Sequence, residues 1–256
     1  MPSKLFDLSG RVALVTGGNG GIGLGMARGM AEAGAAIMVA GRNAEKNAAA
    51  VAELQGLGAD AAAVEVDVTD AASCEAMVAA TKERFGRVDC LVNNAGTAIR
   101  KQPQDYSLAE WQEVLTTNLT SAFVCSQAVY PLMKEQGGGK IVMIGSMMSI
   151  FGASFSAPYA SSKGGIVQLG KSLASSWAKD NIQVNTVLPG WIDTDLTIRA
   201  REQVDGLHQR VLDRTPAGRW GKPQDHAGIA VFLAGSGSDF VTGTSIPVDG
   251  GFSIHI

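Results

Sequence analysis

The sequence predicts an α/β fold in which a doubly wound parallel sheet of about seven strands carries helices on both faces. Short runs rich in Val and Ile alternate with longer segments of helical spacing along the 256 residues. The runs are almost continuously apolar, which is typical of parallel strands that are covered on both sides. A glycine-rich loop follows the first run, at residues 16–23, and leads into a helical segment.

Strand and helix segments alternate from one end of the chain to the other. The predicted strands are 12–15, 37–39, 63–66, 90–92, 141–144, 184–188 and 245–248, and the predicted helices are 22–33, 45–57, 71–85, 108–136, 159–179 and 223–234. Such alternation implies right-handed crossovers between parallel strands. No Pro/Gly/Ser-rich linker divides the chain, so we expect one domain over residues 1–256. The irregular part near 191–220 is either a substrate loop or a solvated helical excursion.

Composition excludes several classes of protein. The 21 basic and 24 acidic residues give a net charge of −3, which argues against a nucleic-acid partner. No run reaches the ~18 apolar residues of a membrane span, and no signal peptide is evident. Three widely spaced cysteines favour a reducing compartment, and the three histidines lack metal-ligand spacing. We expect a cytoplasmic protein with no membrane or metal site. The three cysteines are Cys74, Cys90 and Cys125, and the three histidines are His208, His226 and His255.

The glycine-rich loop has the context of a phosphate-binding turn. It reads Thr16-Gly17-Gly18-Asn19-Gly20-Gly21-Ile22-Gly23, between a predicted strand and a predicted helix. Glycines let a pyrophosphate approach the backbone, and the helix N-terminus supplies free N–H groups. Two registers fit, one with glycines at 18, 20 and 23 and one with glycines at 17, 21 and 23. The loop predicts a Rossmann-type dinucleotide site, although a glycine turn without a ligand is the alternative.

Residues after the second and third strands bear on the adenosine end of such a cofactor. Arg42 stands at the position where a carboxylate of an NAD-binding site would accept a hydrogen bond from the ribose 2′-hydroxyl. A guanidinium can instead bind a 2′-phosphate, which favours NADP(H) over NAD(H) unless Arg42 merely solvates the turn. Asp67, followed by Val68, could accept a hydrogen bond from adenine, or it could cap the next helix.

A phenol and an ammonium group are spaced for one helix face. Tyr159 and Lys163 are four residues apart, and a nearby Lys⁺ lowers the pKa of a phenol from its reference of about 10. Ser146 follows the fifth strand, and the segment 93–96 (Asn-Asn-Ala-Gly) follows the fourth, at the sheet edge where ligands bind. Asn118 is a poor helix former inside a predicted helix and so has a local reason to be there.

Together these motifs resemble the short-chain dehydrogenases/reductases over nearly the whole chain. The resemblance implies that Tyr159 exchanges a proton with the substrate oxygen, that Ser146 orients this oxygen, that Lys163 binds the nicotinamide ribose and that Asn118 holds a water connecting Lys163 to solvent. The cofactor-binding residues implied are Gly17, Asn19, Gly21, Ile22, Gly23, Arg42, Asp67, Val68, Asn94, Ala95, Gly96, Tyr159, Lys163, Pro189, Gly190, Ile192 and Thr194.

Two further segments, 177–185 and 214–223, resemble the gluconate 5-dehydrogenase and 2-deoxygluconate 3-dehydrogenase group. This resemblance implies a sugar-acid substrate, whose carboxylate Arg100 and Lys101 could meet unless both are surface charges. Met148, Phe155 and Trp191 are expected around the substrate as well as Ser146. These side chains are apolar for a sugar pocket, so a more hydrophobic ketone stays open as an alternative.

The sequence therefore predicts an NADP(H)-dependent oxidoreductase that interconverts a secondary alcohol and a ketone on a sugar acid or polyol. A 3-oxoacyl-thioester reductase is an alternative enzyme, and a non-catalytic redox sensor is the alternative of another class. The family resemblance and the apolar tail 252–256 together predict a homotetramer.

Overall fold

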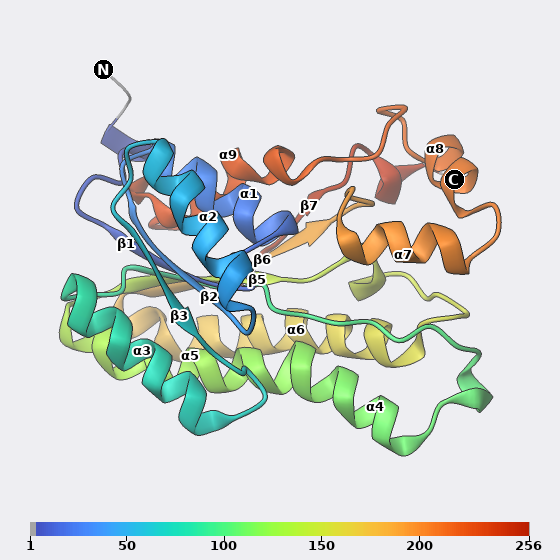
Figure 1. The fold of residues 1–256 in the computed structure, drawn as a ribbon, viewed down its shortest axis with the longest axis horizontal. Coiled ribbons are helices and arrows are strands. Elements are labelled where there is room, and N and C mark those ends of the chain that lie inside the picture. Colours follow the sequence, from blue (N-terminus) through green and yellow to red (C-terminus); the bar gives the residue numbers. More distant parts are fainter. Residues whose placement is uncertain (1–3, 256) are drawn as a thin grey trace.

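Seven parallel strands form one open sheet in the computed structural model, which describes residues 4–255 (Figure 1). The strand order is β3-β2-β1-β4-β5-β6-β7, and every neighbouring pair is parallel. The strands are β1 (Val12–Thr16), β2 (Ala36–Gly41), β3 (Ala61–Glu65), β4 (Cys90–Asn93), β5 (Gly139–Ile144), β6 (Ile182–Pro189) and β7 (Ser245–Val248). The predicted fold class is confirmed.

Helices cover both faces of this sheet, and each face has its own hydrophobic core (Figure 1). One face carries α1 (Gly21–Glu32), α2 (Ala44–Gly56) and α9 (Ala227–Ala234). The other carries α3 (Ala71–Phe85), α4 (Leu108–Leu115), α5 (Ser121–Glu135) and α6 (Ala157–Trp177). Every residue of β1 and of β6 is buried, because side chains from both faces pack against helices.

The sheet order reverses between β1 and β4, and this reversal positions the site. Chain connections leave to opposite sides at such a point, so a crevice opens at the carboxyl ends of the two strands. Thr16 joins the two sides, because its hydroxyl donates to Val92 O at 3.2 Å and accepts from the backbone N–H groups of Asn94 and Ala95. The loops after β1 and β4 are thereby held together.

The structure differs from the predicted elements in one long helix. The predicted helix 108–136 is divided into α4, a π-helical turn at Thr116–Thr120 and α5. The segment 191–220 contains two helices, α7 (Asp195–Gln203) and α8 (Leu207–Arg214), which agrees with the helical one of its two predicted alternatives. Among the described residues, we find no helix long and apolar enough to cross a bilayer. Ile256, the end of the apolar tail, lies outside the described residues.

Candidate active site

A groove of about 410 Å³ lies at the carboxyl ends of β1, β4, β5 and β6. Most of the residues predicted for the cofactor and the proton transfer line this groove. They are Gly17, Asn19, Gly21, Ile22, Asn94, Ala95, Gly96, Ser146, Tyr159, Lys163, Pro189, Gly190, Ile192 and Thr194. The groove therefore brings together four loops that are far apart in the sequence.

The glycine loop leaves room that a side chain would fill. Gly17 has a φ of +62°, and a Cβ there would lie 2.9 Å from Asn94 Nδ2. A Cβ on Gly23 would lie 2.4 Å from Gly17 O. Asn94 Nδ2 donates to Thr16 O and Gly17 O at 3.0 and 3.1 Å, which fixes the turn. Gly23 thus serves the shape of the loop and is not among the residues that line the groove.

The N-terminus of α1 faces this groove with free backbone donors. Its N-cap is Gly20, which has no side chain to cap the first turn. Unpaired N–H groups and the helix dipole favour an anion at this point. The residues present therefore fit the pyrophosphate of a dinucleotide, in the register of glycines at 17, 21 and 23.

The adenosine end of the groove is organised around the loop after β2. Asn19 Nδ2 donates to Asn47 Oδ1 at 2.6 Å, and Asn47 Nδ2 donates to Gly41 O at 2.8 Å. Arg42 is exposed beside this network and outside the groove lining. Lys46, one turn further, does line the groove, and its Nζ lies 3.2 Å from Asp195 Oδ2 on α7. The sequence reasoning missed Lys46, because its partner is far away in the chain.

Asp67 also lies outside the groove lining, in the turn before α3. Its Oδ1 accepts from the backbone N–H and the hydroxyl of Thr69 at 3.0 and 2.7 Å. These two bonds hold the pKa of Asp67 below its usual range, and the positive charge of Arg42 adds to the effect. The N-cap of α3 is Asp70, so Asp67 shapes the turn without capping the helix. Val68 follows it, half-buried against the core.

Tyr159 and Lys163 lie one turn apart on α6, as predicted. Lys163 is buried, its Nζ donates to Ile144 O at 2.7 Å and it lies 5.7 Å from the Tyr159 ring centroid. Burial lowers the pKa of Lys163 to about 8. Burial also raises the pKa of Tyr159, and Ser146 and the charge of Arg100 oppose this rise. Ser146 and Arg100 therefore favour the phenolate in addition to the predicted Lys163, whose ammonium group lies close to the ring.

Ser146 is held by a tight turn after β5. Its backbone N–H donates to Ser149 Oγ, and its own Oγ accepts from Met148 N, each at 3.1 Å. Ser149 Oγ in turn donates to Lys163 O at 2.7 Å. The turn and α6 are thereby linked, which sets Ser146 beside Tyr159 in the groove lining.

Asn118 sits in the π-helical turn and is 2% exposed. Its Nδ2 donates to Thr97 O and Ser162 Oγ at 3.0 Å each, and its Oδ1 accepts from Thr97 N at 2.8 Å. The side chain therefore ties the loop after β4 to α6. These bonds explain why Asn118, a poor helix former, stands inside a helical segment. The π-helical turn that holds it is a feature frequent at functional sites. The expected role of Asn118 in holding a water stays a prediction.

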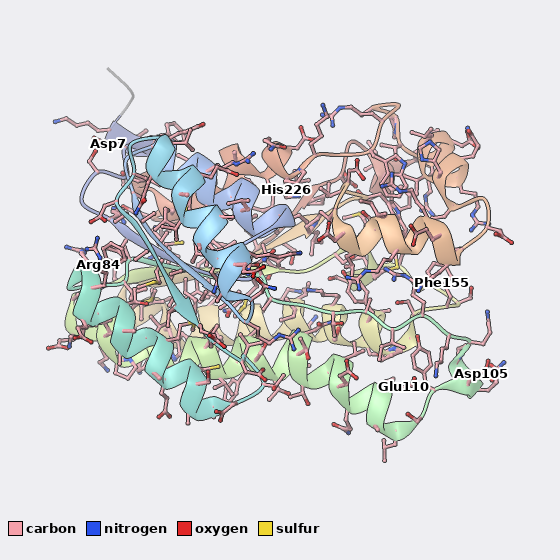
Figure 2. All side chains as sticks on the ribbon, in the orientation of Figure 1. Asp7, Arg84, Asp105, Glu110, Phe155 and His226 are labelled. Atoms are coloured by element: carbon pink, nitrogen blue, oxygen red, sulfur yellow. The ribbon has the colours of Figure 1, made fainter. Side chains whose placement is uncertain are left out.

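The predicted substrate residues Met148, Phe155 and Trp191 line a second cavity of about 670 Å³, which we call the outer cavity. It lies between the segment 151–155, the end of α7, α8 and the C-terminal turn, and Figure 2 shows Phe155 at the α7 end of the molecule. The groove and the outer cavity share no lining residue. The predicted substrate residues Met148, Phe155 and Trp191 thus line a different cavity from Ser146, Tyr159 and Lys163.

Arg100 lies at the division between the groove and the outer cavity. It donates to Leu196 O, which lines the groove, and to Gln203 Oε1, which lines the outer cavity, at 3.1 and 3.2 Å. Lys101 points elsewhere, because its ammonium pairs with Glu110 at the start of α4. Of the two cations expected to meet a carboxylate, Arg100 is the one that bonds to residues lining both cavities.

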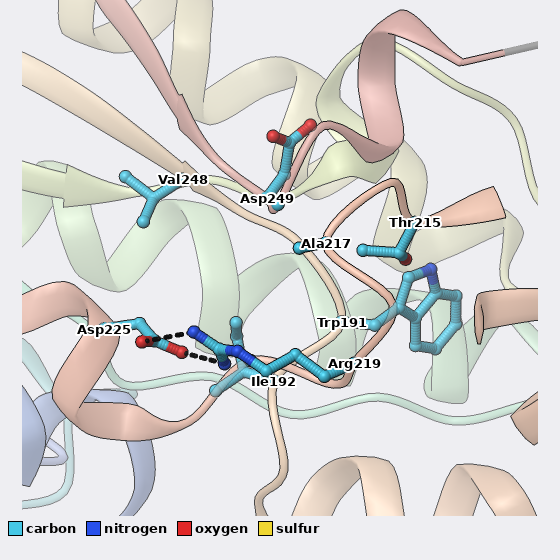
Figure 3. A pocket seen from close by; sticks show the side chains of 10 residues that line it. Trp191, Ile192, Thr215, Ala217, Arg219, Asp225, Val248 and Asp249 are labelled. Atoms are coloured by element: carbon cyan, nitrogen blue, oxygen red, sulfur yellow. Dashed lines mark hydrogen bonds and ion pairs between the residues drawn. The ribbon is translucent and has the colours of Figure 1, made fainter.

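A third, smaller pocket of about 140 Å³ adjoins the outer cavity behind Trp191 (Figure 3). Arg219 bridges it with a two-pronged ion pair to Asp225, at 2.7 and 2.9 Å. Asp249 accepts from the backbone N–H groups of Gly251 and Ser253, so its carboxylate is also satisfied within the chain. The charged groups of this pocket are thus bonded within the chain, and Trp191 is the residue that lines both it and the outer cavity.

Comparison with known proteins places the chain among enzymes of one family. The sequence model described as enoyl-(acyl carrier protein) reductase matches residues 17–253. The 2-dehydro-3-deoxy-D-gluconate 5-dehydrogenase of Dickeya dadantii is 42% identical over 96% of this chain and 97% of its own length. The gluconate 5-dehydrogenase of Gluconobacter oxydans is 39% identical over 98% of each chain.

A solved structure agrees with this placement. The gluconate 5-dehydrogenase of Burkholderia cenocepacia, in complex with NADP and tartrate, has a TM-score of 0.94 and 39% identity over 99% of both chains. The family model, the full-length relatives and the shared fold lead to one conclusion: the chain belongs to the short-chain dehydrogenase/reductase family and is an oxidoreductase.

Proposed function

We propose that this protein is an NADP(H)-dependent oxidoreductase that interconverts a secondary alcohol and a ketone on a sugar acid of the gluconate/ketogluconate type. The observation that carries the proposal is the groove itself, in which Ser146, Tyr159 and Lys163 face a glycine cradle for a dinucleotide. The relatives named for gluconate and deoxygluconate substrates cover almost the whole chain, which supports the substrate class.

The chemistry divides between the cofactor and the chain. When bound, the nicotinamide supplies or accepts the hydride. Tyr159 exchanges the proton with the substrate oxygen, and the Ser146 hydroxyl orients that oxygen beside it. Lys163 is a buried cation close to the phenol, so it stabilises the phenolate that remains when Tyr159 has donated its proton. Asn118 positions α6 relative to the loop after β4.

NADP(H) is the proposed cofactor in preference to NAD(H). Arg42 stands exposed after β2, where no carboxylate is present to accept from a ribose hydroxyl. Lys46 adds a second cation at the same end of the groove. A 2′-phosphate there would be met by two positive charges, and NADP is present in the Burkholderia cenocepacia structure.

Arg100 is the proposed contact to substrate near the reacting carbon. It is half-buried, and its charge acts directly on the Tyr159 phenol. A guanidinium in this place can donate hydrogen bonds to the oxygens of a sugar acid and offset its negative charge. Since Arg100 also bonds α7, substrate would replace or extend contacts that already hold the segment 191–220 over the groove.

A hydrophobic ketone is the second candidate substrate class. The outer cavity presents Met148, Phe151, Phe155 and Trp191, and such a lining suits an apolar group as well as the face of a sugar. A homotetramer is also proposed, supported by the exposed apolar side chains of Phe240 and Ile254, which are 104% and 85% exposed in the single chain.

The first test is a fluorescence titration with NADPH and NADH, followed by a substrate panel with each. The panel holds 5-keto-D-gluconate, other keto sugar acids, an acetoacetyl thioester and hydrophobic ketones. Tighter binding of NADPH with turnover of a keto sugar acid supports the proposal. Turnover of the thioester or the hydrophobic ketones alone would overturn the sugar-acid assignment and leave the reaction type intact.

A further inference from the structure

Arg214 is an arginine with unused donors. It ends α8, and its guanidinium carbon lies 4.8 Å from the ring centroid of Phe151 and 4.5 Å from that of Phe252. These ring contacts orient the cation but use none of its N–H groups. Nε is buried without a hydrogen-bond partner, and within residues 4–255 we find no ion pair for this side chain. A buried donor without an acceptor costs free energy, which points to an acceptor outside the chain.

Arg214 lines the outer cavity together with a second donor of the same kind. In the described part of the chain, Trp191 Nε1 is also buried without a partner, and Trp191 lines this cavity too. The remaining walls are largely aromatic, so the cavity combines flat apolar surfaces with N–H donors. A polyhydroxy carboxylate has the matching chemistry, because its C–H faces pack on rings and its carboxylate accepts two parallel N–H bonds from a guanidinium.

The chain segments that carry the catalytic groups continue into the lining of the outer cavity. Met148 is two residues after Ser146, and Phe155 is four residues before Tyr159. Arg100 stands at the division and acts on Tyr159, so it is the cation at the reacting end. Because Arg100 bonds to a lining residue of each cavity, a linear substrate with its carbonyl beside Tyr159 would have to pass Arg100 to reach Arg214.

We propose that Arg214 anchors a substrate carboxylate that lies several carbons away from the reacting carbonyl, with Trp191 as a further donor. Arg100 then binds oxygens close to the reacting carbon, and Arg214 determines which carbon of a sugar acid is presented to Tyr159. This inference rests on the proposed function and adds to it a residue that selects the position of reaction.

The test compares two ketones that differ at the far end alone. In 5-keto-D-gluconate the carboxylate lies four carbons from the carbonyl, and in L-sorbose a neutral CH₂OH group replaces it. Arg214→Met removes the charge and keeps an apolar side chain against Phe151 and Phe252. Arg214→Lys keeps the charge but lacks the two parallel N–H groups of a guanidinium. Arg84→Met is the matched control, because the Arg84 guanidinium also lies over a ring, that of Phe85, but it is exposed and lines neither the groove nor the outer cavity.

We expect Arg214→Met to raise the KM for 5-keto-D-gluconate about tenfold or more. The KM for L-sorbose, the kcat and the Kd for NADPH stay within about twofold of the wild type. Arg214→Lys recovers part of the loss, and Arg84→Met changes each constant less than twofold. Equal losses with both ketones, or no loss with either, would overturn the proposal. Dissociation of the oligomer by Arg214→Met, seen by light scattering, would also overturn it by assigning the missing acceptor to a partner copy.

The two proposals fail in different ways. If no keto sugar acid is turned over, the binding of D-gluconate to the NADP⁺ complex is followed by tryptophan fluorescence in the same variants. Binding that depends on Arg214 without turnover contradicts the proposed function and supports the anchor. If 5-keto-D-gluconate is turned over and its KM is the same in the Arg214 variants as in the wild type, the proposed function is supported and the anchor is contradicted.

Discussion

At the residue scale, the burial of Tyr159 and Lys163 has opposite effects on their two pKa values. Burial raises the pKa of the phenol and lowers that of the ammonium group to about 8, because each change disfavours a charged form. In the reduction direction Tyr159 must give up its proton and leave a phenolate beside Lys163. The charge of Lys163 is therefore required when the proton moves, and it is present at neutral pH.

The rate of ketone reduction should accordingly fall as the pH rises through about 8. Below this value Lys163 is protonated and stabilises the phenolate, and above it the charge is lost. The measurement is kcat with saturating NADPH and ketone between pH 6 and 10. A profile that stays level up to pH 10 would contradict the role given to the Lys163 charge.

Tyr159→Phe should keep cofactor affinity and lose turnover by about a thousandfold, which is within the range for a general acid. The phenyl ring preserves the packing on α6 and lacks the proton. Tyr130→Phe is the control, because its hydroxyl donates to Asp180, which is not among the residues lining the groove. Equal turnover by the Tyr159→Phe and Tyr130→Phe proteins would remove Tyr159 from the mechanism.

Arg42→Asp should reverse the preference for NADPH. The change removes a cation from the proposed 2′-phosphate site and supplies a carboxylate that can accept from a ribose hydroxyl. The ratio of the Kd for NADH to the Kd for NADPH should drop at least tenfold, measured by fluorescence titration. An unchanged ratio would show that Lys46, or another group at this end of the groove, carries the discrimination.

At the element scale, the π-helical turn between α4 and α5 connects α6 to the loop after β4 through Asn118. Asn118→Leu leaves the N–H and C=O of Thr97 without their side-chain partners, so we expect a loss of about 2–3 kcal/mol in the free energy of unfolding. Asn43→Ala is the comparison, because it removes an exposed cap of α2 and should cost about 1 kcal/mol. Urea denaturation measures both. Equal costs would mean that the turn does not depend on Asn118.

The strands and the glycine loop could be predicted from the sequence because their signals are local. The continuous apolar runs of β1 and β6 follow from burial on both faces, and the loop at 16–23 combines tight turns with a helix start. The π turn could not be predicted, although Asn118 marked its place, because it depends on bonds to Thr97 and Ser162.

The arrangement around the substrate was also beyond local signals. The position of Arg100 between two cavities and the pairing of Lys46 with Asp195 join segments that are distant in the chain. The stacking of Arg214 between Phe151 and Phe252 is of the same kind. Sequence spacing identified the catalytic groups, and tertiary packing decided which cavity each neighbouring side chain enters.

At the scale of the whole molecule, a buried histidine couples folding to pH. His226 lies under α1 (Figure 2) and is 0% exposed, and within residues 4–255 neither ring nitrogen has a partner in hydrogen-bonding geometry. Burial lowers its pKa from 6.5 to about 4, and the backbone of Lys222 and the charge of Asp225 offset this in part. The unfolded chain therefore binds one more proton than the folded chain between these two values.

The stability of the folded protein should fall as the pH is lowered from about 6.5 to about 4, by about 3 kcal/mol in total from His226 at 1.36 kcal/mol per pKa unit. His226→Leu removes the titrating group, so its free energy of unfolding should decline less steeply over this range. Leu233→Ala is the control, since it weakens the core beneath α9 without changing a titratable group and should keep the wild-type slope. Urea denaturation at pH 7, 6, 5 and 4 gives the three slopes. Identical slopes for wild type and His226→Leu would mean that other groups govern the acid limit of the fold, whereas a flattened slope for His226→Leu alone assigns it to this imidazole.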